Sequence, residues 1–461
     1  MSVRCSCIVI VALSALGACA SETADSPAAT VVVSTSAATI PATTIPATTI
    51  PVVTSPSEPI STTRPNAAVS RWAEDMEALG EGIRRIHPNP FWRQPEAEFD
   101  SSLKAAPEHL ASLGDNDARA EVMRITAKID GHTGVYLDEA GFHLYAIHLY
   151  AFGNDIHIVA ASDPALFGAT VLRIDGMPTA AAIDAVTPYS PFDNAATVEL
   201  VVPALLATPE VLHAAGVVDD VNAPHFIVRL PDGSERTIDP EQLSWEEFAA
   251  TIDPRPIGMA KIASIPSLAR VDEPFWTTVF DNNAPDGGQT LYLQYNEVVR
   301  KSGSVSIDQL ADEIGTTLDS GAVTRLVVDL RYNPGGDDRT YRSLLRMLTT
   351  NPALSRPGSL LVLIGRQTFS AAVLLATELD KQTNAVFIGE PTGGSPNLYA
   401  NPRPLQLPNS KVVVNVSSKY FEVGGPSDHR DAIAPDIAVT TSLDDLLAGR
   451  DPVLDTALAQ S

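Results

Sequence analysis

The chain has 461 residues, of which 44% are hydrophobic and 19% are charged, a composition typical of globular protein with room for two or three domains. Asp and Glu outnumber Lys and Arg by 56 to 31, and the net charge of −25 argues against nucleic acid or an anionic membrane surface as the main partner. The only cysteines are Cys5, Cys7 and Cys19, so the chain after residue 19 holds no disulfide, no cysteine-ligated metal and no cysteine nucleophile.

The beginning of the chain resembles a bacterial export signal. Arg4 precedes an apolar run at residues 8–13, which is shorter than the ~18–20 residues that a membrane-spanning helix needs. Residues 16–19, Leu-Gly-Ala-Cys, resemble a lipobox, which implies that Cys19 is lipidated and anchors the protein to the outer face of the cytoplasmic membrane. The alanines on both sides of Cys19 leave ordinary cleavage and secretion open. In both cases the chain is exported, and residues 1–19 are interpreted as a signal peptide with a lipobox.

Residues 20–66 have a composition unlike that of a folded domain. The segment 21–66 contains seven prolines and eleven threonines, and Thr-Ile-Pro-Ala-Thr occurs twice in succession over 39–48. Proline interrupts helices and threonine favours extended chain, so this composition buries no core. We expect residues 20–66 to be a disordered, semi-extended stalk.

Residues 67–138 have the apolar spacing of helices and predict an N-terminal helical domain. Apolar residues separated alternately by four and three positions form one helix face: Trp72, Met76, Leu79, Ile83 and Ile86. Further helices are predicted near 99–113 and 117–129, followed by a polar loop at 130–134.

Residues 139–262 have mixed character. The pattern predicts strands at 156–160 and 170–174, a turn at 175–176, a short helix at 180–186 and a hairpin that begins at 225–230. This order resembles a PDZ-type module, although the stretch 188–222 does not fit a compact one.

Residues 263–461 alternate strands with helices. Strands are predicted at 290–295, 325–330, 360–364 and 385–388, and helices after a capping box at Ser306, at 341–348 and at 370–379. The alternation predicts an α/β layer with a largely parallel sheet, and ligands of such sheets bind beyond the carboxyl ends of the strands.

Two connections at that edge of the sheet carry residues suited to chemistry. The first, 329–338, contains adjacent glycines, Gly335 and Gly336, whose backbone can approach a ligand and whose N–H groups can bind an oxyanion. The second, 365–373, places Ser370 between a strand and the start of a helix. There the hydroxyl is exposed and the N–H groups of the helix point toward the same place. Each has an ordinary alternative, because Asn-Pro-Gly-Gly is also a turn sequence and serine is also a preferred helix N-cap.

Together, residues 285–455 resemble the tail-specific, or C-terminal-processing, peptidase family, and more closely its tricorn-like branch. The resemblance rests on Asp-Leu-Arg-Tyr-Asn-Pro-Gly-Gly at 329–336, Thr-Phe-Ser-Ala-Ala at 368–372, Gly-Glu-Pro-Thr-Gly-Gly-Ser at 389–395 and Ile-Ala-Pro-Asp-Ile at 433–437. It implies a crotonase-like α/β catalytic domain at 263–461, preceded by the helical region and the mixed, PDZ-like middle domain. It also implies that Ser370 is the nucleophile, with no metal and no cofactor. The N–H of Ala371 and an N–H of the Gly335-Gly336 turn would form the oxyanion hole.

The chain departs from the family pattern at the general base. The Ser–Lys branch carries a lysine just after the second glycine of its Gly-Glu-x-Thr-x-Gly-Lys loop, and alignment on Gly-Glu-Pro-Thr at 389–392 gives this chain Ser395 at that place. A serine hydroxyl does not act as a base near neutral pH. The tricorn-like branch uses a histidine from an earlier loop, and His132, in Asp-Gly-His-Thr, occupies that kind of position. His87 and His429 are the other candidates.

The carboxylate partner is predicted from the late acidic residue of the family. Asp428 lies closest to that position and would orient the imidazole and stabilise its cation. Asp431 is the competitor, and a solvated run of charges is the alternative interpretation.

The sequence therefore predicts an exported serine peptidase in which His132 activates Ser370 to form an acyl-enzyme. The expected partners are a peptide or protein substrate and the membrane, the latter through the lipid anchor only, with no nucleic acid and the oligomeric state left open. Two alternatives remain. One is a catalytically inactive envelope module that binds peptides, and the other is an esterase that uses the same serine.

Overall fold

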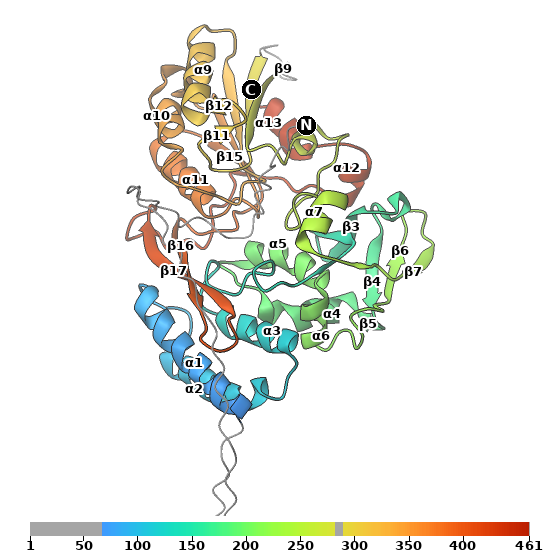
Figure 1. Cartoon of the computed structure of the whole chain (residues 1–461). Coiled ribbons are helices and arrows are strands. Elements are labelled where there is room, and N and C mark those ends of the chain that lie inside the picture. The colour runs from blue at the N-terminus through green and yellow to red at the C-terminus, as the bar shows by residue number, and fades with distance from the viewer. Residues whose placement is uncertain (1–66, 282–288, 461) are drawn as a thin grey trace, which may run out of the picture.

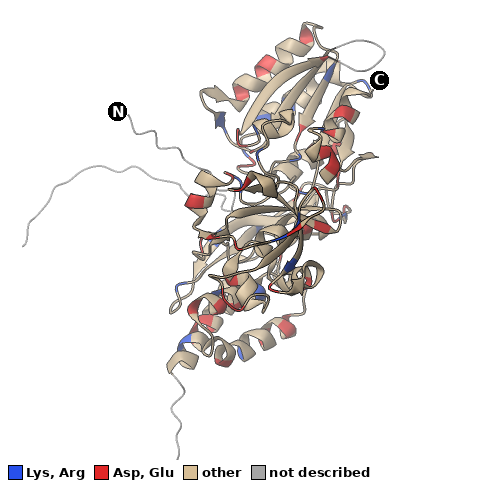
Figure 2. Cartoon of the chain, turned by 90° about the vertical axis from the view of Figure 1, so that its right-hand side faces the viewer, with Lys and Arg blue, Asp and Glu red and all other residues tan. Residues whose placement is uncertain are grey.

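The structure is a computed structural model that describes residues 67–281 and 289–460. Cys19, the predicted signal peptide and the predicted stalk lie outside the described residues. Within those two ranges, no helix combines the length and the hydropathy that crossing a membrane requires. Asp and Glu occur on helices at both ends of the molecule (Figure 2), so the acidic residues are not confined to one part of the described chain.

The N-terminal helices form where the apolar spacing predicts them. They are α1 (Ala67–Ile86), α2 (Glu96–Leu110) and α3 (Asp115–Thr126). Met76, Leu79 and Ile83 of the predicted face are buried, and Trp72 and Ile86 pack against the same core from its edge. The chain leaves α3 through the loop that carries His132.

The middle of the chain forms a six-stranded sheet with helices around it. The sheet consists of β2 (Ile147–Phe152), β3 (Asp155–Ala161), β4 (Thr170–Ile174), β5 (Met177–Pro178), β6 (Phe226–Arg229) and β7 (Glu235–Ile238), and β1 (Leu144–Tyr145) pairs separately with β8 (Gln242–Leu243). The helices are α4 (Thr179–Val186), α5 (Ala195–Leu206), α6 (Pro209–Ala214), α7 (Trp245–Thr251) and α8 (Pro266–Ala269). The stretch that does not fit a PDZ-type module contains α5, which contacts β2, and α6, which contacts α3. This stretch therefore ties the middle sheet to the N-terminal helices.

The C-terminal half is built on a second six-stranded sheet. Its strands, in spatial order, are β18 (Ile437–Ala438), β15 (Val386–Gly389), β14 (Leu360–Ile364), β13 (Arg325–Asp329), β10 (Gln289–Tyr295) and β9 (Phe275–Asp281). All neighbours from β18 to β10 pair in parallel, and β9 pairs antiparallel at the edge, which confirms the prediction of a largely parallel sheet. Around it lie α9 (Ile307–Asp319), α10 (Arg342–Thr350), α11 (Ala371–Gln382), α12 (Leu443–Leu447), α13 (Pro452–Leu458) and the short pair β11 (Lys301–Ser302) and β12 (Val305–Ser306).

Both faces of this sheet are buried. Leu326 and Val328 of β13 pack in the cluster with α9, α10 and α11, whereas Val327 faces the opposite side and packs with Leu454 of α13. Alternate side chains of a strand point to opposite faces, so the continuous apolar run of β13 is explained by helices on both sides. The carboxyl end of β13 is braced by Arg331, which pairs with Asp329 and with Asp451 at the start of α13.

A long hairpin that the sequence did not predict leaves the C-terminal half. It consists of β16 (Asn397–Gln406) and β17 (Val413–Glu422), and Figure 1 shows it reaching down beside α1 and α3. The carboxylate of Asp75 in α1 accepts N–H bonds from Asn409 and Ser410 at the tip of the hairpin. Val414 and Val416 of β17 belong to the N-terminal core. Because this one core joins residues from both ends of the chain, the domain boundaries at 138 and 262 stay a proposal.

Candidate active site

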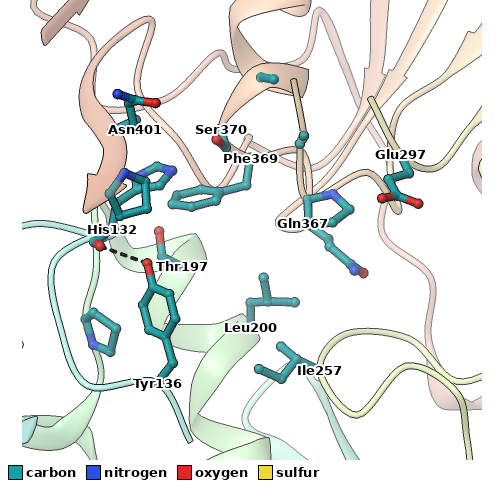
Figure 3. A pocket seen from close by; sticks show the side chains of 18 of the residues that line it. His132, Tyr136, Thr197, Leu200, Ile257, Glu297, Gln367, Phe369, Ser370 and Asn401 are labelled. Atoms are coloured by element: carbon teal, nitrogen blue, oxygen red, sulfur yellow. Dashed lines mark hydrogen bonds between the residues drawn. The ribbon is translucent and has the colours of Figure 1, made fainter. Parts of the chain in front are cut away.

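A pocket of about 540 Å³ lies where the C-terminal sheet meets the loops of the N-terminal half. Its walls are largely apolar and include Leu200, Val201, Trp245, Ile257, Leu374 and Phe421. The pocket is also lined by five residues that the sequence singled out, namely Ser370, Ala371, Gly335, Gly336 and His132. Figure 3 shows Ser370 near the ring of Phe369, with the ring of His132 next to it. Segments more than 200 residues apart in the sequence therefore meet in one cavity.

Ser370 occupies a strained backbone conformation at the start of α11. Its φ of 49° and ψ of −126° lie in a region that residues with a side chain rarely adopt, at a cost of about 1–3 kcal/mol. The preceding turn holds it there, because Thr368 Oγ1 donates to the Leu330 carbonyl (2.8 Å) and the Phe369 N–H donates to the Asn333 carbonyl (3.1 Å). The Ser370 side chain makes no capping hydrogen bond to the helix. The N-cap alternative is therefore wrong.

The Gly335-Gly336 turn lies directly against Ser370. A Cβ at Gly335 would come within 2.6 Å of the Ser370 Cβ, and its φ of 116° also favours glycine. The Gly335 N–H donates to Asn333 Oδ1 (2.9 Å), so this donor is already used. In residues 67–281 and 289–460, neither the Gly336 N–H nor the Ala371 N–H has a hydrogen-bond partner. Gly335 thus allows the close approach, and the other two residues carry the N–H groups that remain available to an oxyanion.

The His132 loop is fixed at its backbone. The His132 N–H donates to Asp130 Oδ1 (2.7 Å), and Gly134 exchanges two backbone hydrogen bonds of 2.9 Å with Asn415 of β17. The Tyr136 hydroxyl donates to the His132 carbonyl (2.9 Å), the bond drawn in Figure 3. The hairpin that the sequence did not predict therefore holds the loop of the predicted base.

The imidazole of His132 is buried and has no hydrogen-bond partner. Its residue is 1% exposed, and neither ring nitrogen has a partner among the described residues. The ring stacks on Phe369, with centroids 4.4 Å apart and an angle of 16° between the planes. Burial lowers the pKa of His132 to about 4, and the charge of Asp130 opposes part of this shift. In this conformation His132 is neutral near pH 7 and is not hydrogen-bonded to the Ser370 hydroxyl.

The two other candidate histidines are placed differently. His87 is buried, and its Nε2 lies 2.6 Å from Asp130 Oδ2, so its side chain is already engaged. His429 is exposed. Neither of them lines the pocket, whereas His132 does.

Asp428 is not brought to the pocket, and the expected pairing of Asp428 with His132 is not formed. The Asp428 carboxylate accepts from Arg430 Nε (3.0 Å) and Nη2 (2.7 Å), and Arg430 also reaches Asp380 (2.8 Å). A guanidinium two residues away on the same turn meets this carboxylate more readily than a buried imidazole does. The side chain of Asp431 is exposed, and its carbonyl accepts from the Ser395 hydroxyl (2.9 Å).

Asp193 is a buried carboxyl beside the His132 loop that the sequence analysis did not identify. Its Oδ1 accepts from the Gly131 N–H (3.0 Å), and its Oδ2 has no partner in the described chain. Burial, reinforced by the negative charge of Asp130, raises the pKa of Asp193 to about 7, although Arg93 opposes the shift. The one signal of this site in the sequence is the glycine at 131. A Cβ at that position would come within 3.0 Å of the Asp193 carboxyl, so the contact favours glycine there.

We expect Asp193→Asn to stabilise the protein at pH 8 and to have little effect at pH 4. A carboxyl whose pKa is raised by folding lowers the stability progressively as the pH rises from its unfolded pKa, near 4, to about 7. At ~1.36 kcal/mol per pKa unit, the penalty above pH 7 is at most about 4 kcal/mol. Denaturant unfolding of both proteins at several pH values measures it. An equal difference in unfolding free energy at pH 4 and pH 8 would contradict the assignment.

Comparisons with known proteins give one sequence match within the C-terminal half and several similar folds. The sequence model of peptidase family S41 matches residues 349–439, a segment that includes Ser370. The structure of mature CPAF complexed with lactacystin has a TM-score of 0.61 and 13% identity, with 85% of this chain and 98% of that chain covered. The crystal structure of mature CPAF has a TM-score of 0.59 and 13% identity, with coverage of 85% and 97%.

At this identity the structural likeness shows a shared fold, and it supports the predicted α/β architecture with a helical N-terminal region. Comparison with curated proteins gives no significant match. The match over 349–439 contains three of the four motifs on which the resemblance rests, those at 368–372, 389–395 and 433–437. The segment that carries Ser370 is therefore similar to peptidase family S41, in agreement with the resemblance of residues 285–455 to the tail-specific, or C-terminal-processing, peptidases.

Proposed function

We propose that the protein is an exported serine peptidase that hydrolyses peptide bonds through an acyl-enzyme at Ser370, with His132 as the general base. The observation that carries the proposal is the state of Ser370. It combines a strained backbone, a hydroxyl free of capping bonds, and the unpaired N–H groups of Gly336 and Ala371 beside it. Strain of this kind is retained where a site needs it, and here it supports a nucleophile.

The reaction follows from these groups. His132 takes the proton of the Ser370 hydroxyl as Oγ attacks the scissile carbonyl carbon, and the N–H groups of Ala371 and Gly336 donate to the oxyanion that forms. His132 then gives this proton to the leaving amine, and the C–N bond breaks to leave an ester on Ser370. A water molecule, deprotonated by His132, cleaves the ester and restores the serine.

The resting position of His132 requires one movement before this reaction. The ring must turn so that a nitrogen meets the Ser370 hydroxyl. Neither ring nitrogen has a partner at hydrogen-bond distance, so the rotation gives up the stacking on Phe369 and the polar interaction with the Tyr399 backbone. Hydrogen bonds of catalytic groups are often formed only when substrate is bound.

Two observations keep an inactive peptide-binding module as the second candidate. Ser395 stands where the Ser–Lys branch has its base, and its hydroxyl is bonded to the Asp431 carbonyl. In addition, His132 has no partner in this conformation. An esterase would use the same nucleophile, and the substrate profile separates it from a peptidase.

The proposal is tested by labelling the protein with a fluorophosphonate probe and mapping the modified peptide by mass spectrometry. We expect the label on Ser370, and turnover of a mixed peptide library faster than that of small acyl esters. Lactacystin, which one of the CPAF structures contains, is a second probe for the same serine. Absence of both label and hydrolysis would identify a binding module, and turnover of esters alone would identify an esterase.

Cys19 is proposed to carry the lipid anchor. Metabolic labelling of the full chain with a fatty-acid precursor is expected to modify the native protein and not Cys19→Ser, and the variant should be lost from the membrane fraction. The change removes the thiol to which the acyl chains are joined, so no other linkage replaces it. An unlabelled native chain found in the medium would instead indicate ordinary signal cleavage and secretion.

A further inference from the structure

Asp130 is a buried carboxylate that the reaction described above does not use. It is 0% exposed and lies two residues before His132. We propose that Asp130 is the positioning carboxylate for His132, in the role that the sequence assigned to Asp428. This inference rests on the proposed function, because it concerns how the base of that reaction is held and charged.

The hydrogen bonds of Asp130 join three separate parts of the chain. Its Oδ1 accepts from the His132 N–H (2.7 Å) and from Ser417 Oγ of β17 (2.9 Å). Its Oδ2 accepts from His87 Nε2, just after α1 (2.6 Å), and from Thr133 Oγ1 (3.0 Å). One carboxylate therefore fixes the backbone of His132 relative to both the N-terminal helix and the hairpin.

His87 donates to Asp130 without neutralising it. The Asn89 N–H donates to His87 Nδ1 (3.0 Å), so this nitrogen is an acceptor and carries no proton. The proton of the imidazole is then on Nε2, which faces Asp130. The pair is a neutral imidazole bonded to a carboxylate, and a full negative charge remains next to the His132 loop.

The other charged groups packed around Asp130 leave it as the ionised carboxylate. Asp193, beside Gly131, has a pKa of about 7 and is largely protonated below that pH. Burial alone would raise the pKa of Asp130, but the hydrogen bonds from His87 and from the His132 N–H hold it below its ordinary value. The guanidinium of Arg93 is bonded to the carbonyls of Phe192 and Asp193, and its charge also favours ionised Asp130.

A buried negative charge has a defined effect on a general base. When His132 accepts the Ser370 proton, an imidazolium forms in a site where burial disfavours the charged state. Asp130 and the backbone of Tyr399 both oppose this penalty by raising the pKa of His132, and of the two Asp130 has the larger effect and carries the negative charge. Asp428 lacks this effect, since it is near the surface and paired with Arg430.

The test compares three single substitutions in the full folded chain. Asp130→Asn removes the charge, Ser417→Ala removes one hydrogen bond to Asp130 but keeps the charge, and Asp428→Asn is the matched control. The titration of His132 is followed by NMR of the protein labelled at histidine Cε1, and the rate of probe labelling is measured over the same pH range. Thermal unfolding of each variant is recorded first.

We expect Asp130→Asn to shift the His132 titration and the acid limb of labelling to lower pH and to reduce the labelling rate at pH 7 by about 10²-fold or more. Ser417→Ala should lower the rate by less than about tenfold and leave both pH values unchanged, because a net charge still faces His132. Asp428→Asn should change neither. If Asp130 had a purely structural role, Asp130→Asn and Ser417→Ala would differ only in their labelling rates, and the His132 titration would occur at the same pH in both.

A shift of the titration by Asp428→Asn, or none by Asp130→Asn, overturns the proposal. If Asp130→Asn does not fold, the double variant Asp130→Asn with Ser417→Asp moves the carboxylate to β17, at the residue whose Oγ now lies 2.9 Å from Asp130 Oδ1. We then expect the titration to stay near the wild-type pH, and a lower value in a folded double variant also overturns the proposal. If the wild type is not labelled at all, the proposed function fails, whereas the NMR titration still tests Asp130.

Discussion

Replacing Ser370 by alanine is expected to abolish covalent labelling by the fluorophosphonate probe and to reduce peptide hydrolysis by roughly 10⁶-fold. The hydroxyl is the atom that bonds to the probe and to the acyl group, so no residual path through this site remains. The fold should be retained, because the Ser370 side chain makes no capping hydrogen bond in the structure. The measurements are labelling, hydrolysis and thermal unfolding of the same preparation.

Two further variants make this result specific. Ser370→Gly should be equally inactive yet unfold at a higher temperature than Ser370→Ala, because glycine tolerates the φ of 49° with less strain, by about 1 kcal/mol. Ser395→Ala should keep activity within about twofold of wild type, since its hydroxyl is bonded to a backbone carbonyl away from Ser370. Persistent label on Ser370→Ala would reject Ser370 as the nucleophile.

Replacing His132 by alanine is expected to lower the rate of peptide hydrolysis by about 10²–10⁴-fold, the usual contribution of a general base. His429→Ala and Lys419→Ala are the controls. His429 is exposed, the ammonium of Lys419 lies over the ring of Phe421, and neither residue lines the pocket that contains Ser370. Each should leave the rate unchanged, and a loss of activity in Lys419→Ala comparable to that of His132→Ala would point to a Ser–Lys mechanism.

The pH dependence of the wild type tests the same residue independently. A base must be unprotonated to act, and the pKa of His132 is lowered to about 4 by burial. The acid limb of kcat/KM, which reports the free enzyme, is therefore expected near pH 4 rather than near the ordinary histidine value of about 6.5. An acid limb at 6.5 that disappears in His429→Ala would transfer the role to that exposed histidine.

Local pattern is sufficient for most of the elements. Their signals in the sequence extend over only a few residues. Four such elements form where predicted: the apolar face of α1, the capping box at Ser306, and the strands β13 and β14. The glycines beside Ser370 are also visible in the sequence, because only glycine tolerates so close an approach. The hairpin β16–β17 was missed, since its partner is α1, more than 300 residues earlier.

The choice of carboxylate shows the limit of reasoning along the chain. Asp428 stands at the expected place in the sequence, but Arg430 pairs with it near the surface. Asp130 gives no comparable signal, because Asp-Gly-His-Thr also reads as a polar loop. It becomes a partner for His132 only when α1 and β17 bury it and supply His87 and Ser417.

The sequence by itself determined the α/β class, the nucleophile candidate, the absence of cysteine chemistry after residue 19 and the acidic balance, all of which depend on composition and short-range spacing. Only the tertiary structure decided which N–H groups are free, which histidine lines the pocket and which carboxylate accepts from the backbone of that histidine. These are contacts between segments far apart in the chain, and burial sets their charge states. The excess of acidic residues, prominent in the composition, is distributed over helices at both ends of the molecule, whereas the carboxylate that we propose for the chemistry is buried.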